Sequence, residues 1–191
     1  RFTNVSRVLC FDINARKNPT KLVCSTLNAQ LHVWDVGLER IERSWKTQNP
    51  VTALQYEQTG ALVASGTSTG LVNVWDMRKH YGTHSFQAHG GVCSVVAFHP
   101  GGELLLLSGG EDGLIRVWDL VESNLRAQLN NHLSVVTSIA FSPNDQWKVY
   151  SAGRDKVINV WDIRPLSGTV AIDDQRYHKT TIPVYESVES L

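Results

Sequence analysis

The sequence has little of several features that mark whole classes of proteins. Its three cysteines, Cys10, Cys24 and Cys93, are odd in number and lack the spacing of metal ligands. They fall within or beside expected strands, so we expect buried free thiols in a reducing compartment rather than disulfides or a zinc site. The longest apolar run is Leu104–Leu107, far short of a membrane span, and the first residues lack the layout of a signal peptide.

Neither sign of charge is in excess. The 191 residues include 18 Lys and Arg and 18 Asp and Glu, so the formal net charge is zero. The whole chain therefore has no electrostatic attraction to nucleic acid, and any such contact would have to come from a local patch. The chain is 42% hydrophobic and 19% charged, which is ordinary for one soluble domain with a core.

What the sequence does contain is a repeat. A Trp-Asp pair recurs at steps of 41, 43 and 43 residues, and His89 and His132 each stand 29 residues before a Trp. The four pairs are Trp34-Asp35, Trp75-Asp76, Trp118-Asp119 and Trp161-Asp162. A period of about 40 to 45 residues, with His upstream and Trp-Asp downstream, is typical of four-stranded propeller blades.

Each repeat predicts four strands. Apolar residues one and three positions before each Trp enclose a polar one, and this period of two predicts a strand ending at the Trp-Asp pair. An aromatic residue marks the end of an inner strand upstream, at Phe11, Tyr56, Phe98 and Phe141. We expect middle strands such as Leu104–Ser108, and outer strands such as Ile41–Lys46 and Leu125–Leu129.

These columns resemble the WD-repeat family of β-propellers. In that family a His, a Ser or Thr, an Asp and the Trp form a buried hydrogen-bond chain within a blade. Two repeats fill all four positions, with His89, Ser108, Asp112 and Trp118 in the third and His132, Ser151, Asp155 and Trp161 in the fourth. The second repeat has Thr47, Ser65 and Thr69 in these columns, and the first has Phe2, Cys24 and Asn28. The first two blades should therefore depend more on packing.

The resemblance predicts an all-β fold, an incomplete arc of about four four-stranded blades from a larger WD-repeat β-propeller. The repeats end near Asp35, Asp76, Asp119 and Asp162. Residues 184–191 would begin a further blade. The loop between Phe11 and Lys21 should be extended, and Pro165–Gln175 is a candidate for a mobile or partner-ordered loop.

No catalytic or cofactor site is expected. Gly66–Gly70 matches the G-x-S-x-G nucleophile elbow, but that elbow needs a following helix, whereas the same columns of later repeats predict a hairpin turn. His80 and His84 have helical spacing, yet a metal site needs three or four ligands and Gly82 argues for a loop. We predict a protein that is not an enzyme and has no metal, cofactor or small-molecule substrate.

Two features are candidates for partner binding. The segment Met77–His84 should join a third strand to an outer strand and gather Arg78, Lys79, His80 and His84, and with Tyr81 these basic groups could meet an RNA phosphate and base. The motif W-D-x-R occurs at Trp75–Arg78 and Trp161–Arg164, and resembles substrate receptors that dock on the adaptor of cullin-RING ubiquitin ligases. Arg78 and Arg164 would then be contact residues, or else simply solvated loop residues.

Longer stretches resemble the WD-repeat proteins of the small-subunit processome. They are residues 75–86, 95–100, 104–120, 151–163 and 182–190. This resemblance implies a non-enzymatic scaffold of the nucleus and nucleolus for pre-rRNA processing and small ribosomal subunit biogenesis. It implies other processome proteins, including WD-repeat proteins, and the pre-ribosomal RNA complex as partners, without a membrane. The competing function is a ubiquitin-ligase substrate receptor that docks through W-D-x-R.

Overall fold

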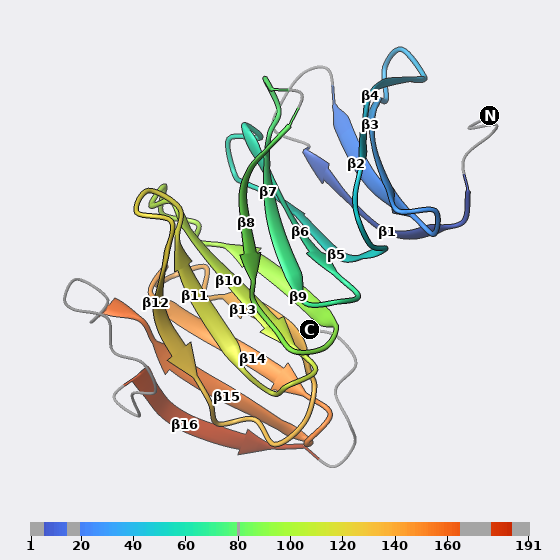
Figure 1. Ribbon diagram of the computed structural model, residues 1–191. Coiled ribbons are helices and arrows are strands. Elements are labelled where there is room, and N and C mark those ends of the chain that lie inside the picture. The colour runs from blue at the N-terminus through green and yellow to red at the C-terminus, as the bar shows by residue number, and fades with distance from the viewer. Residues whose placement is uncertain (1–5, 15–19, 80, 165–176, 185–191) are drawn as a thin grey trace.

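Four antiparallel sheets, one for each repeat, make up the fold (Figure 1). The computed structural model describes residues 6–14, 20–79, 81–164 and 177–184, and in these residues sixteen strands form four four-stranded sheets. The first blade contains β1 (Val8–Asn14), β2 (Lys21–Thr26), β3 (Gln30–Asp35) and β4 (Arg40–Lys46). The second contains β5 (Val51–Tyr56), β6 (Leu62–Thr67), β7 (Leu71–Asp76) and β8 (Gly82–Gln87).

The third and fourth blades repeat this order. The third contains β9 (Cys93–Phe98), β10 (Leu105–Gly110), β11 (Ile115–Asp119) and β12 (Asn124–Leu129). The fourth contains β13 (Val136–Phe141), β14 (Lys148–Gly153), β15 (Val157–Asp162) and β16 (His178–Pro183). The blades follow one another along an arc, with the inner strands β1, β5, β9 and β13 as neighbours. The predicted fold, an incomplete propeller of four blades, is confirmed.

Hydrophobic side chains fill the space between neighbouring blades. The ring centroids of Trp45 and Trp75 lie 5.4 Å apart across the first boundary, and Phe86 stacks on Trp118 at 4.6 Å across the second. The Trp of a repeat thus packs against the outer strand of the preceding blade. Because aromatic side chains bury large areas, these contacts contribute strongly to holding the blades together.

Hydroxyl groups also cross the blade boundaries. Thr52 on β5 donates to the backbone oxygen of Cys93 at 2.6 Å, and Ser94 on β9 donates in the same way to a backbone oxygen of β13. At the first boundary, the Ser25 hydroxyl donates to the oxygen of Val51 at 3.0 Å. Directional bonds therefore fix the position of each blade beside the next.

The hairpin between the second and third strands uses one special backbone position, five residues before each Trp. Its φ is positive in all four blades, at Ala29 (57°), Gly70 (81°), Gly113 (74°) and Lys156 (64°). The predicted turn at Asp112-Gly113 is therefore confirmed. Ala29 and Lys156 adopt a left-handed conformation that costs an L-residue about 1–2 kcal/mol, whereas glycine adopts it freely.

The first inner strand is longer than predicted. It does not end near Phe11 but continues to Asn14, because the pairing of β1 with β2 extends to Asn14 opposite Lys21. Part of the polar segment after Phe11 is therefore strand, and residues 15–19 lie outside the described part of the chain. The predictions for Pro165–Gln175 and for a further blade fall on residues 165–176 and 185–191, which also lie outside it.

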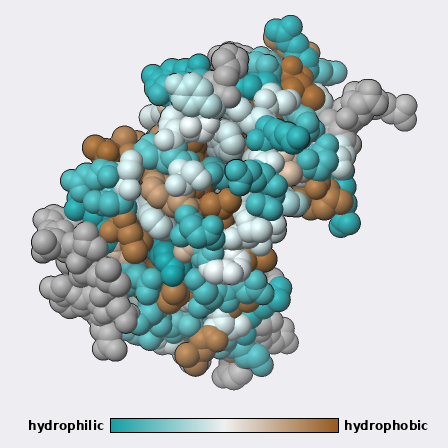
Figure 2. Space-filling view, viewed as in Figure 1, coloured by the Kyte–Doolittle hydropathy of each residue, from teal (hydrophilic) through white to brown (hydrophobic). Residues whose placement is uncertain are grey.

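The surface is mixed in character. On the face shown in Figure 2, hydrophobic side chains are scattered among hydrophilic ones. Exposed large hydrophobic residues are concentrated on β1, where they are Val8, Leu9, Phe11 and Ile13. In the described parts of the chain, we find no helix long and apolar enough to cross a bilayer.

Candidate functional site

The third blade contains a buried chain of hydrogen bonds. Trp118 Nε1 donates to Ser108 Oγ at 3.0 Å, and His89 Nε2 lies 2.9 Å from the same oxygen. On the other side of the imidazole, Nδ1 lies 2.9 Å from Asp112 Oδ1. If His89 carries its proton on Nδ1, the indole donates to Ser108, the hydroxyl donates to Nε2, and Nδ1–H donates to the carboxylate. This tautomer satisfies the indole, the hydroxyl, the imidazole and the carboxylate, and Arg116 Nη1, which lies 3.0 Å from Nδ1, then donates to Asp112 instead of to the ring.

Electrostatics favour the neutral imidazole in this blade. Burial lowers the pKa of His89, against the opposing effect of Asp112. Burial alone would raise the pKa of Asp112, but hydrogen bonds and charge interactions with Arg116 and His89 hold it below its usual value. Arg116 Nη1 lies 2.8 Å from Asp112 Oδ2, so the carboxylate is stabilised from two sides.

The fourth blade repeats the arrangement. Trp161 Nε1 donates to Ser151 Oγ at 2.8 Å, and His132 Nε2 lies 2.7 Å from that oxygen. His132 Nδ1 lies 2.9 Å from Asp155 Oδ2, which also accepts a bond from the Leu133 backbone N–H. The structure therefore brings each predicted set of four side chains together.

The order Ser-His-Asp in these blades is that of a hydrolytic triad, but the environment does not suit catalysis. Ser108 and Ser151 are fully buried, and each hydroxyl oxygen already accepts a bond from an indole N–H. A nucleophile must reach the substrate and a position for an oxyanion. These groups are arranged to hold strands together rather than to attack a substrate.

The first two blades retain only part of this chain. In the second, Trp75 Nε1 donates to Ser65 Oγ at 2.8 Å, but Thr47 bonds instead to the backbone oxygens of Ala29 and Asn49. In the first, the Cys24 thiol takes the place of the serine beside Trp34. Phe2 lies outside the described residues. No imidazole connects strands in these positions, so packing has to supply more of the stability there.

Gly66–Gly70 is a hairpin, as the repeat predicts. Strand β6 ends at Thr67 and β7 begins at Leu71, so no helix follows Ser68. The described residues also contain no group of three or more His, Cys, Asp or Glu side chains that could hold a metal ion. Cys93 is a buried free thiol whose pKa is raised to about 12 by burial.

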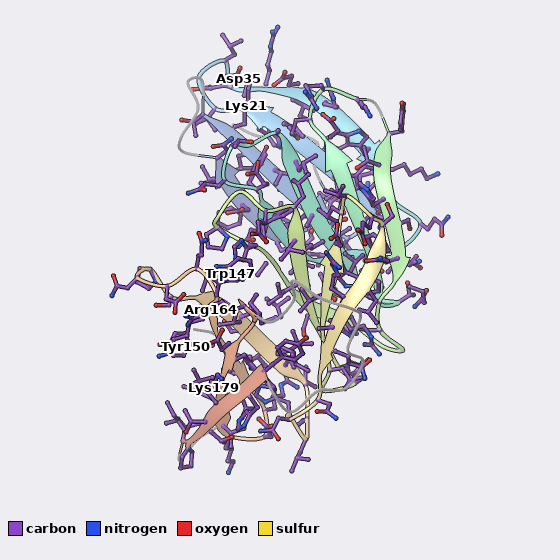
Figure 3. The ribbon with its side chains drawn as sticks, turned by 90° about the vertical axis from the view of Figure 1, so that its left-hand side faces the viewer. Lys21, Asp35, Trp147, Tyr150, Arg164 and Lys179 are labelled. Carbon is purple, nitrogen blue, oxygen red and sulfur yellow. The ribbon has the colours of Figure 1, made fainter. Side chains whose placement is uncertain are left out.

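The carboxylate of every Trp-Asp pair is bonded to a cationic side chain. In the second and fourth blades the partner is the arginine of W-D-x-R, whereas in the first and third blades it comes from another strand. Two of the partners, Lys21 and Arg164, are labelled in Figure 3. The pairs are Lys21–Asp35 at 2.7 Å, Arg78–Asp76 at 2.8 Å, Arg126–Asp119 at 3.0 Å and Arg164–Asp162 at 3.0 Å. The same carboxylates accept backbone N–H bonds from the following loop, for example from Arg78 at 2.8 Å. Each Asp therefore shapes the turn after its strand.

The two W-D-x-R arginines take part in this local pairing. Arg78 makes two side-chain bonds to Asp76 and lowers the pKa of that carboxyl to about 2. Arg164 bonds to Asp162 and to Asp145, at 3.0 and 2.8 Å. Their side chains are nevertheless 79% and 56% exposed. The motif thus has a structural role in each loop, while part of each guanidinium faces solvent.

The loop after β7 presents Lys79 and Tyr81 together. Lys79 Nζ lies 5.9 Å from the centre of the Tyr81 ring, which is 65% exposed, and Arg43 of the first blade donates to the backbone oxygen of Lys79 at 2.5 Å. His80 lies outside the described residues. His84 lies within β8 opposite Val74 rather than in the loop, contrary to prediction, but it lines one hollow together with Arg78 and Lys79.

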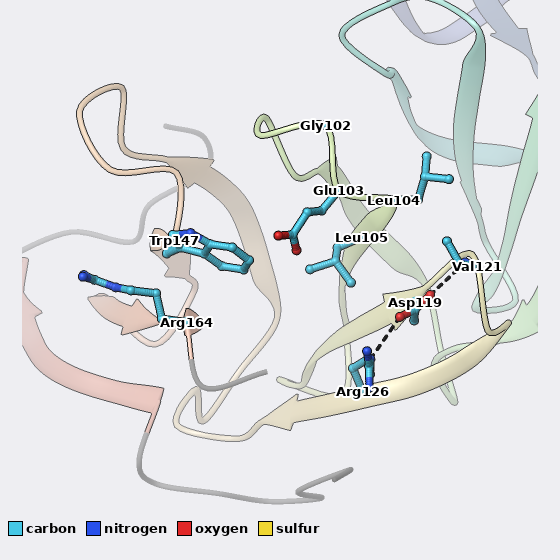
Figure 4. Close-up of a pocket in the computed structure, with 9 residues that line it drawn as sticks. All are labelled: Gly102, Glu103, Leu104, Leu105, Asp119, Val121, Arg126, Trp147 and Arg164. Atoms are coloured by element: carbon cyan, nitrogen blue, oxygen red, sulfur yellow. Dashed lines mark hydrogen bonds and ion pairs between the residues drawn. The ribbon is translucent and has the colours of Figure 1, made fainter. Parts of the chain in front are cut away.

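Hollows lie between blades on the side where the Trp-Asp pairs end. One of about 620 Å³ separates the third and fourth blades, and is lined by Leu104, Leu105, Val121 and Trp147 with charged groups around them (Figure 4). In it, Asp119 is bonded to Arg126. A corresponding hollow of about 660 Å³ lies between the second and third blades and shares Gly102 and Leu104. Exposed Leu104 therefore forms a ridge between the two hollows.

Sequence reasoning missed two sets of residues. Among the cations that pair with the Trp-Asp carboxylates, Arg78 and Arg164 share the W-D-x-R spacing, but Lys21 and Arg126 follow no common spacing, so the sequence carries no signal for these two. The hydroxyls of Thr52 and Ser94, which cross blade boundaries, do have a signal, because each stands four residues before the aromatic of its inner strand. Thr137 fills the same column in the fourth blade, where it donates to the backbone oxygen of Ala152 in the same sheet. The recurrence of Ser or Thr at this position could therefore have been found by aligning the repeats in the sequence.

Comparison with known proteins agrees with this geometry. The WD domain, G-beta repeat family matches residues 40–76, 82–119 and 123–162, together more than half of the chain. Transducin beta-like protein 3 of Rattus norvegicus is 41% identical over 88 residues, 45% of this chain and 11% of that protein. The Homo sapiens protein of the same name is 37% identical over 95 residues, 49% of this chain and 12% of its own length.

A more distant relative is U3 small nucleolar RNA-associated protein 13 of Saccharomyces cerevisiae. It is 33% identical over 69 residues, 36% of this chain and 8% of that protein. The matched part therefore spans only about a tenth of the length of these curated relatives. The repeat, the four blades and the family match agree, and the chain belongs to the WD40-repeat family of β-propeller proteins.

Proposed function

We propose that the chain is part of a non-enzymatic scaffold that works in the small-subunit processome, in pre-rRNA processing and small ribosomal subunit biogenesis. The observation that carries this proposal is the similarity to transducin beta-like protein 3 and to a protein whose name states association with U3 small nucleolar RNA. The proposed location is the nucleus and the nucleolus, and the proposed partners are other processome proteins, including WD-repeat proteins.

The physical basis of the proposal is rigidity. Aromatic contacts and hydroxyl bonds fix each blade beside the next, and the buried His-Ser-Trp chains stabilise the third and fourth blades internally. A rigid series of blades holds its loops at fixed distances, so several partners can bind at once in a defined geometry. In this account His89, Ser108, Asp112 and Trp118, with their counterparts in the fourth blade, are structural residues.

The residues proposed for partner contact follow the third strands of the second and fourth blades in sequence. They are Arg78, Lys79, His80, Tyr81 and Arg164, as predicted from sequence. Among the described ones, Tyr81 and the two arginines have large exposed fractions. In the ubiquitin-ligase alternative, the outer part of each guanidinium would contact the adaptor while the Asp bond holds the arginine in place.

The experiment that tests the proposal compares two complexes. The protein that contains this chain is tagged in cells and purified from nuclear extract, together with a variant carrying Arg78→Ala and Arg164→Ala. Recovery of processome proteins with U3 RNA supports the scaffold, and the variant should retain most of them. Recovery of a cullin and its adaptor, lost in the variant, would instead establish the ubiquitin-ligase function and overturn the proposal.

A further inference from the structure

The outer strand of the second blade differs from the other three outer strands. An outer strand is a free sheet edge, and proteins protect such edges with charged residues, proline or short strands. Strand β4 carries four charged side chains, β12 carries Arg126, and β16 carries Lys179 and ends at Pro183. Strand β8 reads Gly-Thr-His-Ser-Phe-Gln and has no Asp, Glu, Lys, Arg or Pro. It is the unprotected outer edge among the described blades.

The backbone of β8 offers bonding groups to a neighbour. The N–H of Ala88 bonds to the oxygen of Gly70 at 2.9 Å, which makes Gln87 and Leu71 a non-hydrogen-bonded pair of the ladder. In an antiparallel sheet, hydrogen-bonded and non-hydrogen-bonded pairs alternate along the strands, so Ser85 and Asn73, two residues further on, are also a non-hydrogen-bonded pair. The N–H and C=O groups of Ser85 and Gln87 therefore point away from β7, and both residues are exposed.

A polar groove of about 400 Å³ runs beside β8. It is lined by Gly82, Thr83, His84 and Ser85 of β8, by Asn73 of β7, and by Lys46, Gln48 and Asn49 of the preceding blade, among others. The side chains of Asn73 and Ser85 have no hydrogen-bond partner among the described residues. The groove thus has amide and hydroxyl groups free to bind a ligand.

The charge of this groove has one sign. Its lining includes Lys46 and His84 but no Asp or Glu, whereas the hollow of Figure 4 contains Glu103 and Asp119. The hollow on the other side of the start of β8 shares His84 and adds Lys79 and Arg78. That second hollow also contains Glu57 and Asp76, and Asp76 is paired with Arg78. The cation that faces no carboxylate in its own groove is therefore Lys46, with Lys79 beside the start of β8.

We propose that the β8 edge is a docking site for an extended acidic peptide segment of a partner protein, which would add a fifth strand to the second blade. Its main chain would bond to Ser85 and Gln87, and its carboxylates, two residues apart on one face, would lie along the side that carries Lys46. Single-stranded RNA fits less well, because the groove's indole, Trp75, is only 8% exposed and its other ring, His84, is already stacked on Phe86. The inference needs only the fold and is independent of a role in ribosome biogenesis.

The test uses the whole chain and a fluorescent ten-residue peptide of alternating Thr and Glu, with binding followed by anisotropy. A Thr-Lys peptide of the same length and a ten-nucleotide uridine RNA are the competing probes. Ser85→Pro removes an N–H that the ladder does not use, so the sheet should tolerate it. Gln128→Pro is the matched control, because Gln128 pairs with Arg116 in the third blade as Ser85 pairs with Asn73.

The proposal predicts that the Thr-Glu peptide binds, that Ser85→Pro weakens binding at least about tenfold by removing one main-chain bond and blocking strand addition, and that Gln128→Pro changes it less than twofold. The double variant Lys46→Glu, Lys79→Glu should weaken binding of the Thr-Glu peptide by a similar factor. If Ser85→Pro does not fold, this surface variant tests the proposal in its place. Equal binding of the Thr-Lys peptide, preferential binding of RNA, or no peptide binding at about 1 mM would each overturn the proposal.

Discussion

Replacing His132 with alanine removes the central group of the fourth blade's hydrogen-bond chain. The imidazole is fully buried and joins two partners, Ser151 at 2.7 Å and Asp155 at 2.9 Å. Without it, the Ser151 hydroxyl keeps its bond from Trp161 but loses its acceptor, and the carboxylate of Asp155 keeps only the N–H bond from Leu133. The substitution also leaves a cavity where the ring was.

The expected cost follows from these losses. A buried polar group left without its partner costs about 1–3 kcal/mol, and large-to-small substitutions in a core typically cost about 2–5 kcal/mol. Because Ser151 and Asp155 each retain one bond, we expect His132→Ala to lower the free energy of unfolding by about 3 kcal/mol. For a chain of this size, that corresponds to a fall in Tm of roughly 6–12 °C.

The matched comparison is Thr47→Ala in the second blade. Thr47 bonds only to two backbone oxygens, of Ala29 and Asn49, so its loss should cost about 1 kcal/mol and lower Tm by roughly 2–4 °C. Thermal unfolding followed by circular dichroism at pH 7 measures both variants. A double-mutant cycle of His132→Ala with Asp155→Ala should show coupling. Equal falls in Tm for His132→Ala and Thr47→Ala would refute the assignment of the chain as a stabilising network.

Three further predictions follow from backbone geometry and charge. Gly70→Ala should lower the free energy of unfolding by at least about 2 kcal/mol, because its φ is 81° and an added Cβ would lie 2.0 Å from the backbone oxygen of His89. Gly102→Ala, with φ of 80° but open space around it, should cost only about 1 kcal/mol, and equal costs in chemical denaturation would contradict the steric argument. The pKa of Asp76 is lowered to about 2 by Arg78, so the bond stabilises the fold above about pH 4 and this contribution is lost as the pH falls toward 2. The Tm difference between the wild-type chain and Arg78→Ala should therefore narrow over that range, and a constant difference would exclude the ion pair as its cause. Burial lowers the pKa of His89 below its ordinary value of about 6.5, so its contribution to stability is complete above that pH and declines as the pH falls below it. His89→Gln should remove this part of the acid sensitivity in urea titrations, whereas an unchanged pH profile would show that His89 is not its source.

The repeat made most of the fold predictable from sequence. A period of two before each Trp-Asp pair and an aromatic at the end of each inner strand are local signals, and they placed the ends of β3, β7, β11 and β15 correctly. The hydrogen-bond partners of Ser108 and Ser151 were implied by the resemblance to WD-repeat proteins, and the structure brings them together in the third and fourth blades. The three matched repeats of the family end at Asp76, Asp119 and Asp162, which are the repeat ends predicted from the sequence.

Features that depend on contacts outside the repeat were not predictable. The length of β1 is set by its pairing as far as Lys21, which no spacing in the sequence encodes. His84 was expected in a loop because glycine precedes it, but pairing with Val74 places it in a strand. Lys21 and Arg126, which bond to Asp35 and Asp119, come from β2 and β12, so only the folded chain brings them to those carboxylates.

The central claim is that this chain belongs to a scaffold of the small-subunit processome. It is tested most directly by tagging the protein that contains the chain, purifying it from nuclear extract, and measuring the enrichment of U3 RNA and unprocessed small-subunit rRNA over an untagged control. The account predicts strong enrichment of both RNAs together with other WD-repeat proteins. Absence of both RNAs, with recovery of an unrelated complex such as a cullin and its adaptor, would contradict it.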